Sequence, residues 1–222
     1  MNTVYTTTSQ PTADYLLSQL VTHLEAGEMV VWLLSGGSAI EVATNVRSRL
    51  DGYDLSGLFI SLVDERFGPI GHPHENWQLL LDAGFDMSGI SWYRPLQGKE
   101  LLETTEDYES WLQSHVIAAD YSIGLFGIGS DGHTAGIKPD TVSVVAPGWA
   151  VGYAGPDFER VTMTPYAIEQ LDEAVIQAVG SDKAATIHQL LYDDVQLTDQ
   201  PAQVLKQVKK STLFTDYKEI DV

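Results

Sequence analysis

Cysteine is absent from this chain of 222 residues, which excludes disulfides, thiolate metal ligands and cysteine nucleophiles. Basic residues are scarce, because 12 Lys plus Arg stand against 31 Asp plus Glu, for a formal net charge of -19. The electrostatic field of this negative charge repels nucleic acid and anionic membrane surfaces, so neither is expected as a partner. It also repels small anions. Any phosphate site must therefore be built locally, from a few cations and from backbone N–H groups.

The chain also lacks a long hydrophobic run. No apolar stretch approaches the roughly 18 residues of a membrane-spanning helix, and the N-terminal segment has no basic start followed by an apolar core. A cytoplasmic protein is therefore the default expectation. With 44% hydrophobic residues the chain can bury a substantial core, and its length predicts one domain over residues 1–222. The sequence leaves the oligomeric state open.

Continuous apolar runs bounded by turn residues predict three strands that are buried on both faces, over residues 30–34, 58–63 and 122–126. Shorter strands are expected over residues 142–145, 161–163 and 184–187. Amphipathic patterns predict helices over about residues 12–26, 39–50, 76–83 and 106–118, then from Pro165 to about Val179 and from Pro201 to Val208. This alternation predicts an α/β protein with a three-layer α/β/α, Rossmann-like, doubly wound and mostly parallel sheet.

Ligands of doubly wound sheets bind at the carboxyl ends of the strands, where loops and helix N-termini converge. Three predicted strands deliver polar loops to that edge. The first loop is Ser35-Gly36-Gly37-Ser38, a turn of small residues that lets an anion approach several backbone N–H groups. The same four residues are also compatible with an ordinary strand-to-helix turn that has a serine N-cap.

The second loop is Asp64-Glu65-Arg66, where charged side chains follow a buried strand at once; a solvated ion pair is the simpler interpretation. The third runs from Gly127 to His133. Its glycines permit tight or left-handed backbone, and Asp131 stands two residues before His133, close enough to orient or tune the imidazole. A histidine with an acidic neighbour at this edge is a candidate for catalysis.

Two competing patterns are weaker. His72-Pro73-His74-Glu75 contains metal-binding residue types, but its spacing does not bring them together on a helix face, and no metal site is expected. The series Gly127-x-Gly129-x-x-Gly132 formally matches a dinucleotide fingerprint, yet it continues into His133 rather than opening a smooth helix. No organic cofactor is expected either.

Taken in order along the chain, these motifs resemble the 6-phosphogluconolactonase family, which shares a superfamily with glucosamine-6-phosphate deaminase. The similarity covers nearly the whole sequence. The matching segments are Leu34-Ser35-Gly36-Gly37-Ser38, Asp64-Glu65-Arg66, Gly127-Ile128-Gly129-x-Asp131-Gly132-His133-Thr134-Ala135, Arg160-Val161-Thr162-Met163-Thr164 and Gly180-x-x-Lys183-Ala184. Each segment is a weak signal alone, and the ordered series is a strong one.

The resemblance implies that His133 activates water and that Arg66 assists at the reacting centre. Asp131, which its spacing places to fix the imidazole tautomer, and Asp64 complete the expected catalytic residues. It associates the phosphate of the substrate with Ser35, Gly36, Gly37, Ser38, Arg160 and Lys183. The chain departs from the family where Gly136-Ile137-Lys138 replaces the usual Ser-Leu-Phe, which puts a lysine beside the site. Two smaller departures from the family pattern are Glu75, where serine is usual, and Gly68, where valine is usual.

The function that the resemblance implies is hydrolysis of 6-phosphogluconolactone to 6-phosphogluconate in the pentose phosphate pathway, by a lactone (carboxylic ester) hydrolase that needs no metal or cofactor. The expected partner is then a small phosphosugar lactone. One alternative is deamination and isomerisation of glucosamine 6-phosphate, with an aspartate base at the position of Asp64. That sister family typically has tyrosine after Asp-Glu and an acidic residue in place of Lys138, and both differences favour the lactonase. The other alternative is a non-catalytic sugar-phosphate-binding protein.

Overall fold

A seven-stranded sheet forms the centre of the computed structural model, which describes residues 1–218. All six neighbouring strand pairs are parallel. The strand order is β1 (Asn2–Tyr5), β10 (Lys210–Thr215), β9 (Glu173–Ala178), β6 (Tyr121–Gly127), β2 (Val30–Leu34), β3 (Leu58–Leu62) and β5 (Ser91–Trp92). All residues of β2 and β9 are buried, as expected for central strands that are covered on both faces.

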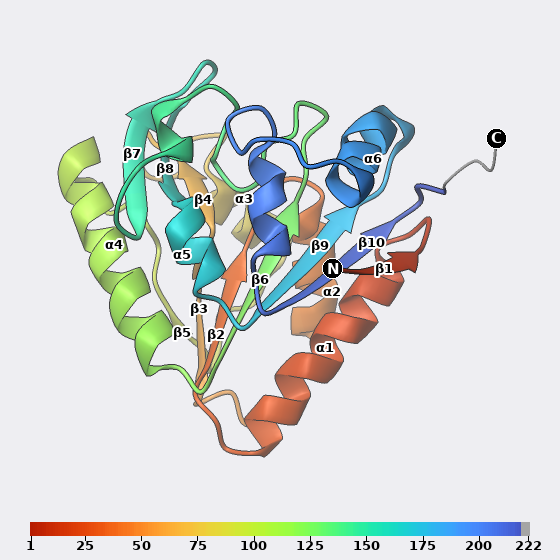
Figure 1. Cartoon of the computed structure of the whole chain (residues 1–222). Helices are drawn as coiled ribbons and strands as arrows, with labels where there is room; N and C mark the ends of the chain where they lie inside the picture. Colours follow the sequence, from red (N-terminus) through yellow and green to blue (C-terminus); the bar gives the residue numbers. More distant parts are fainter. Residues whose placement is uncertain (219–222) are drawn as a thin grey trace.

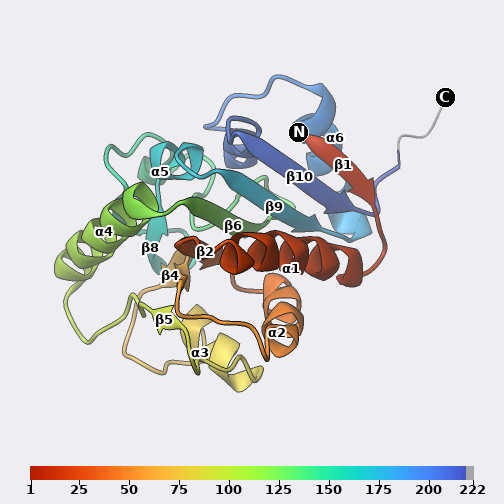
Figure 2. The same ribbon diagram turned by 90° about the horizontal axis from the view of Figure 1, so that it is seen from below.

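Helices cover both faces of this sheet (Figures 1 and 2). On one face lie α1 (Gln10–Glu25), α2 (Ala39–Arg49) and α3 (Asn76–Asp82), and on the other lie α4 (Leu101–Ala118), α5 (Pro165–Glu169) and α6 (Ala184–Tyr192). Successive side chains of β2 point to opposite faces, so Trp32 packs with the first set and Val31 with the second. The predicted three-layer α/β fold is confirmed.

A second, three-stranded antiparallel sheet was not predicted. It consists of β4 (Asp64–Arg66), β8 (Glu159–Met163) and β7 (Ala150–Ala154), in the order β4-β8-β7. One residue separates β4 from β3, so the chain leaves the large sheet and immediately pairs with a strand almost a hundred residues further on. Within this pairing Arg66 lies opposite Arg160. The small sheet thus brings two distant charged segments together.

Several predicted elements are wrong. Residues 142–145 were expected to form a strand, and Val142–Val144 form the 3-10 helix η1. Residues 184–187 were also expected to be a strand, and they begin helix α6 after the short 3-10 helix η2 (Ser181–Lys183). The helix expected from Pro165 to Val179 ends at Glu169, because the following apolar run enters the middle of the sheet as β9. Pro201–Lys206 form the 3-10 helix η3 where an α-helix was expected.

Two helix ends carry the residues typical of their positions, whereas the Ser38 side chain makes no capping hydrogen bond at the start of α2. Gly27 follows α1 with a φ of 74°, the left-handed conformation expected of a C-terminal glycine. At the start of α5, the hydroxyl oxygen of Thr164 accepts a hydrogen bond of 3.2 Å from the N–H of Ala167, and Pro165 occupies the first turn. Within residues 1–218, no helix is both long and apolar enough to cross a membrane.

Candidate active site

All ten predicted site residues line one pocket of about 480 Å³. The loops that follow β2, β6 and β9 form one part of it, and the small sheet forms another. Strand β2 has β3 on one side and β6 on the other, so the strand order reverses direction there. The pocket lies at this switch point, where doubly wound sheets bind ligands. The predicted residues in its lining are Ser35, Gly36, Gly37, Ser38, Asp64, Arg66, Asp131, His133, Arg160 and Lys183.

The turn between β2 and α2 is shaped by its glycines. Gly37 has a φ of 63°, which side chains rarely tolerate. A Cβ atom on Gly36 would lie 2.0 Å from the Oδ1 atom of Asn76, so the Asn76 side chain packs directly on this turn. Asn76 Oδ1 and the Ser35 hydroxyl are buried and have no hydrogen-bond partner within residues 1–218.

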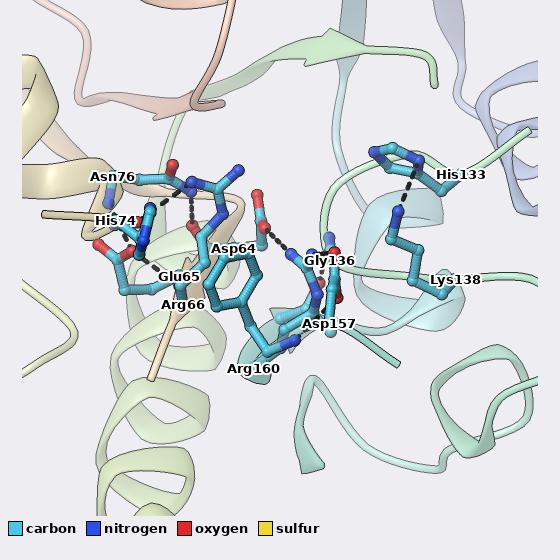
Figure 3. Close-up of polar contacts among 12 residues, drawn as sticks. Asp64, Glu65, Arg66, His74, Asn76, His133, Gly136, Lys138, Asp157 and Arg160 are labelled. Carbon is cyan, nitrogen blue, oxygen red and sulfur yellow. Dashed lines mark hydrogen bonds and ion pairs between the residues drawn. The ribbon is translucent and has the colours of Figure 1, made fainter. Parts of the chain in front are cut away.

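The small sheet forms a wall of buried charges. Arg160 is only 4% exposed and Asp64 only 5%. The Arg160 guanidinium lies 3.5 Å from an Asp64 carboxylate oxygen and 2.8 Å from one of Asp157. Burial raises the pKa of Asp64, and the positive charges of Arg66 and Arg160 oppose that shift. Figure 3 shows the Asp64 carboxyl group between the two guanidinium groups.

Arg66 and Lys183 differ from Arg160, because neither makes an ion pair within the described residues. Arg66 donates one hydrogen bond of 3.1 Å to the backbone oxygen of His74. Its guanidinium carbon lies 5.7 Å from the centre of the Phe158 ring, and that of Arg160 lies 5.7 Å from the same centre. Within residues 1–218, Arg66 and Lys183 are thus pocket cations without a carboxylate in ion-pair contact.

Glu65 points away from this wall and fixes the start of α3. Its fully buried carboxylate accepts hydrogen bonds from the backbone N–H groups of Arg66, Asn76 and Trp77 at 2.7, 2.6 and 2.9 Å. Burial raises the pKa of Glu65 to about 8, while these three donors favour the charged form. The middle residue of the Asp64–Arg66 strand therefore has a structural role, holding Asn76 beside the pocket.

The loop after β6 forms the opposite wall. His133 Nδ1 lies 2.5 Å from Asp131 Oδ1, and Lys138 Nζ lies 3.1 Å from Asp131 Oδ2. Partial burial disfavours the charge on Asp131, but the hydrogen bonds and positive charges of His133 and Lys138 outweigh it and lower the pKa of Asp131 to about 2. When the imidazole is neutral, the charged Asp131 accepts a hydrogen bond from the Nδ1–H group, and the lone pair of the ring is then on Nε2.

Close packing holds this loop in place. Gly132 has a φ of 83°, and Gly129 passes so close to His133 that a Cβ atom there would lie 2.1 Å from the imidazole Nδ1. The hydroxyl groups of Thr134 and Thr186 donate to the backbone oxygens of Gly127 and Ser130 at 2.9 and 2.8 Å. The position of the His133 ring is therefore set by the backbone around it.

Sequence reasoning missed part of the pocket lining. Asp157 carries no motif signal, and only the turn between β7 and β8 brings it to Arg160. The Gly136 departure from the family has a packing cause, because a Cβ atom there would lie 2.7 Å from Thr162 Cβ and 3.1 Å from Asp64 Cβ. Lys138, the other departure, lines the pocket.

The histidines of the 72–75 segment have structural partners. His72 Nε2 lies 2.9 Å from the backbone oxygen of Arg66, and the His74 ring packs 5.1 Å from that of Phe158. In the described part of the chain, no group of three or more His, Asp or Glu side chains is arranged to hold a metal ion.

The family model described as glucosamine-6-phosphate isomerases/6-phosphogluconolactonase matches residues 6–214, and the chain belongs to this family. A curated relative, the 6-phosphogluconolactonase of Borreliella burgdorferi, is 26% identical over 169 residues, which are 71% of each chain. The family is thus one of sugar-phosphate metabolism.

Solved structures share the fold over nearly the full chain. A 6-phosphogluconolactonase from Shewanella baltica superimposes with a TM-score of 0.82 at 17% identity, covering 97% of both chains. A monomeric glucosamine-6-phosphate deaminase gives 0.79 at 18% identity, again with 97% coverage of both. Because the two activities share this fold so closely, the pocket must be used to choose between them.

Proposed function

We propose that the protein hydrolyses 6-phosphogluconolactone to 6-phosphogluconate, a step of the pentose phosphate pathway, and acts on this phosphosugar in the cytoplasm. The observation that carries the proposal is the His133–Asp131 pair, 2.5 Å apart, in the same pocket as the guanidinium of Arg66, which makes no ion pair within residues 1–218. A neutral imidazole with a fixed tautomer is suited to take a proton from water.

In the proposed reaction, Nε2 of His133 removes a proton as water attacks the lactone carbonyl carbon. Arg66 and backbone N–H groups of the pocket stabilise the resulting oxyanion, a contribution of ~3 kcal/mol per donor. The tetrahedral intermediate then collapses, and the bond between the carbonyl carbon and the ring oxygen breaks. The imidazolium returns its proton to that oxygen, so that a hydroxy acid leaves the pocket.

The phosphate is proposed to bind the Ser35–Ser38 turn, Lys183 and Arg160. The backbone N–H groups of the turn and the start of α2, an eleven-residue helix, favour an anion. Among the described residues Lys183 makes no ion pair, whereas the charge of Arg160 is shared with Asp64 and Asp157. We therefore expect Lys183 to contribute more to phosphate affinity than Arg160.

Deamination of glucosamine 6-phosphate is the second candidate, because Asp64 lies in the pocket between two arginines and the fold matches a deaminase. The position of Asp64 disfavours it. A carboxylate that is 5% exposed and paired with Arg160 is poorly placed to accept a proton from a sugar carbon.

A two-substrate assay tests the proposal. Progress curves with authentic 6-phosphogluconolactone, corrected for spontaneous hydrolysis, are compared with ammonia release from glucosamine 6-phosphate. We expect rapid lactone hydrolysis and no ammonia. Ammonia release would establish the second candidate, and calorimetric binding without turnover of either compound would establish a sugar-phosphate-binding protein.

A substrate without phosphate tests the proposed phosphate grip. Lys183→Met is expected to raise KM for the phosphorylated lactone about tenfold and to leave hydrolysis of unphosphorylated gluconolactone unchanged, because only the phosphate needs the ammonium group. Equal losses on both lactones would place Lys183 elsewhere in the mechanism.

A further inference from the structure

Lys138 is an enclosed cation beside the imidazole. Its side chain is 13% exposed, and Nζ lies 3.1 Å from Asp131 Oδ2 and 3.2 Å from His133 Nδ1 (Figure 3 shows the contact with His133). Lysine is among the residues least often enclosed, and when enclosed it is paired. Here its pairing partner is the carboxylate that also holds the histidine.

The backbone that carries Lys138 is fixed. Ile137 is fully buried in the core, and its N–H donates a hydrogen bond of 3.0 Å to the backbone oxygen of Thr134. The hydroxyl group of Thr141 donates a hydrogen bond of 2.8 Å to the backbone oxygen of Lys138. The side chain thus returns from a tight turn to the ring of His133, five residues earlier, and its position is set by that turn.

Asp131 and Lys138 compete for the same imidazole nitrogen. The carboxylate requires a proton on Nδ1, whereas the ammonium group would require a lone pair there. Asp131 Oδ1 is at 2.5 Å and Lys138 Nζ at 3.2 Å, and charged Asp131 is the stronger partner. Lys138 therefore donates to Asp131 Oδ2, which leaves its positive charge next to a ring that must be neutral before it can accept a proton from water.

Charges of both signs face His133 from the other pocket elements. Asp64 and Arg66 come from β4, Arg160 from β8 and Asp157 from the turn before it, and Asp182 and Lys183 come from η2. Arg160 pairs with both Asp64 and Asp157, and these three side chains together carry one formal negative charge when both carboxyl groups are ionised. Asp131 and Lys138 are the charged side chains that contact the ring itself.

We propose that Lys138 is a positioning residue: its ammonium group holds Asp131 against Nδ1 of His133 and places a positive charge beside the ring, which disfavours the protonated imidazole. The catalytic part of this inference rests on the proposed function of His133. The part that concerns the state of the ring does not, and it can be measured without substrate.

Histidine NMR titration of the wild type, Lys138→Met and Lys138→Arg provides that measurement, with His133→Gln to assign the signal. Lys138→Met should move the His133 titration midpoint up by about one pH unit, because a like charge next to the ring is lost. Lys138→Arg should stay close to the wild type. Lys209→Met is the matched control, since it removes a lysine that pairs with Asp172 on the protein surface. A midpoint unchanged in Lys138→Met, or moved equally by Lys209→Met, would overturn the inference.

Lactone kinetics between pH 5.5 and 8 add a second readout. In Lys138→Met the acid limb of kcat/KM should move up with the NMR midpoint, so that kcat/KM falls by up to about tenfold at pH values below both midpoints and changes little at pH values above them. A raised KM at every pH, with the midpoint unchanged, would instead make Lys138 a substrate-binding residue and contradict the proposal. If the wild type does not hydrolyse the lactone, the proposed function fails while the NMR result still decides the role of Lys138.

Discussion

The two walls of the pocket are built differently. The small sheet presents buried charges, because the side chains of Arg160 and Asp64 are 4% and 7% exposed, whereas those of His133 and Asp131 in the opposite loop are 32% and 47% exposed. Buried charges must be paired for the protein to fold, but exposed ones can be altered without a large cost in folding free energy. The buried wall should therefore respond to mutation mainly through stability, and the loop wall mainly through activity.

Arg160→Met tests the buried wall and should have the largest effect on stability. It leaves the Asp64 carboxyl group buried without its ion-pair partner, which should lower the free energy of unfolding by about 3–5 kcal/mol. Urea denaturation measures the change. Arg49→Met is the matched control, because it breaks a surface ion pair with Asp14 and should change the urea midpoint far less. Equal changes in the two variants would remove the distinction between the walls.

Gly129→Ala tests the loop wall. The added methyl group meets the His133 ring, which has to move, so kcat for the lactone should fall about tenfold to a hundredfold while the melting temperature changes little. Gly127→Ala serves as its control, since a Cβ atom there has no neighbour within 4 Å, and its loss of kcat should be smaller. A large drop in stability with unchanged kcat would reverse the roles of the walls.

Asp131→Asn should have the smallest effect on stability, and that effect should depend on pH. Because the folded-state pKa of Asp131 is lowered to about 2, its charge stabilises the fold above the unfolded pKa and stops doing so as the pH falls through about 2. The difference in unfolding free energy between wild type and variant should thus be present at pH 5 and vanish towards pH 2. A difference that grows on acidification would contradict the lowered pKa.

The loop wall was predictable from the sequence because its parts are local. Asp131 and His133 are two residues apart, and the flanking apolar strand places them at the sheet edge. The same is true of the Ser35–Ser38 turn between β2 and α2. Apolar runs and helix caps follow short-range rules, so strands β2, β3 and β6 of the large sheet could also be predicted from the sequence.

The buried wall was harder to predict, because it depends on a pairing between distant segments. Nothing in Asp64–Arg66 resembles a strand, and only its register with β8 sets Arg66 opposite Arg160. Asp157 reaches Arg160 for the same reason. Strand β9 was mistaken for helix because burial on both faces, and not local propensity, determines its structure.

Replacement of His133 is the most direct test of the account. The kcat of His133→Ala on 6-phosphogluconolactone, corrected for spontaneous hydrolysis, is compared with that of the wild type, and thermal melts check that both are folded. Loss of a general base predicts a decrease of at least about a hundredfold with an unchanged melting temperature. An unchanged kcat in the folded variant would contradict the proposed mechanism.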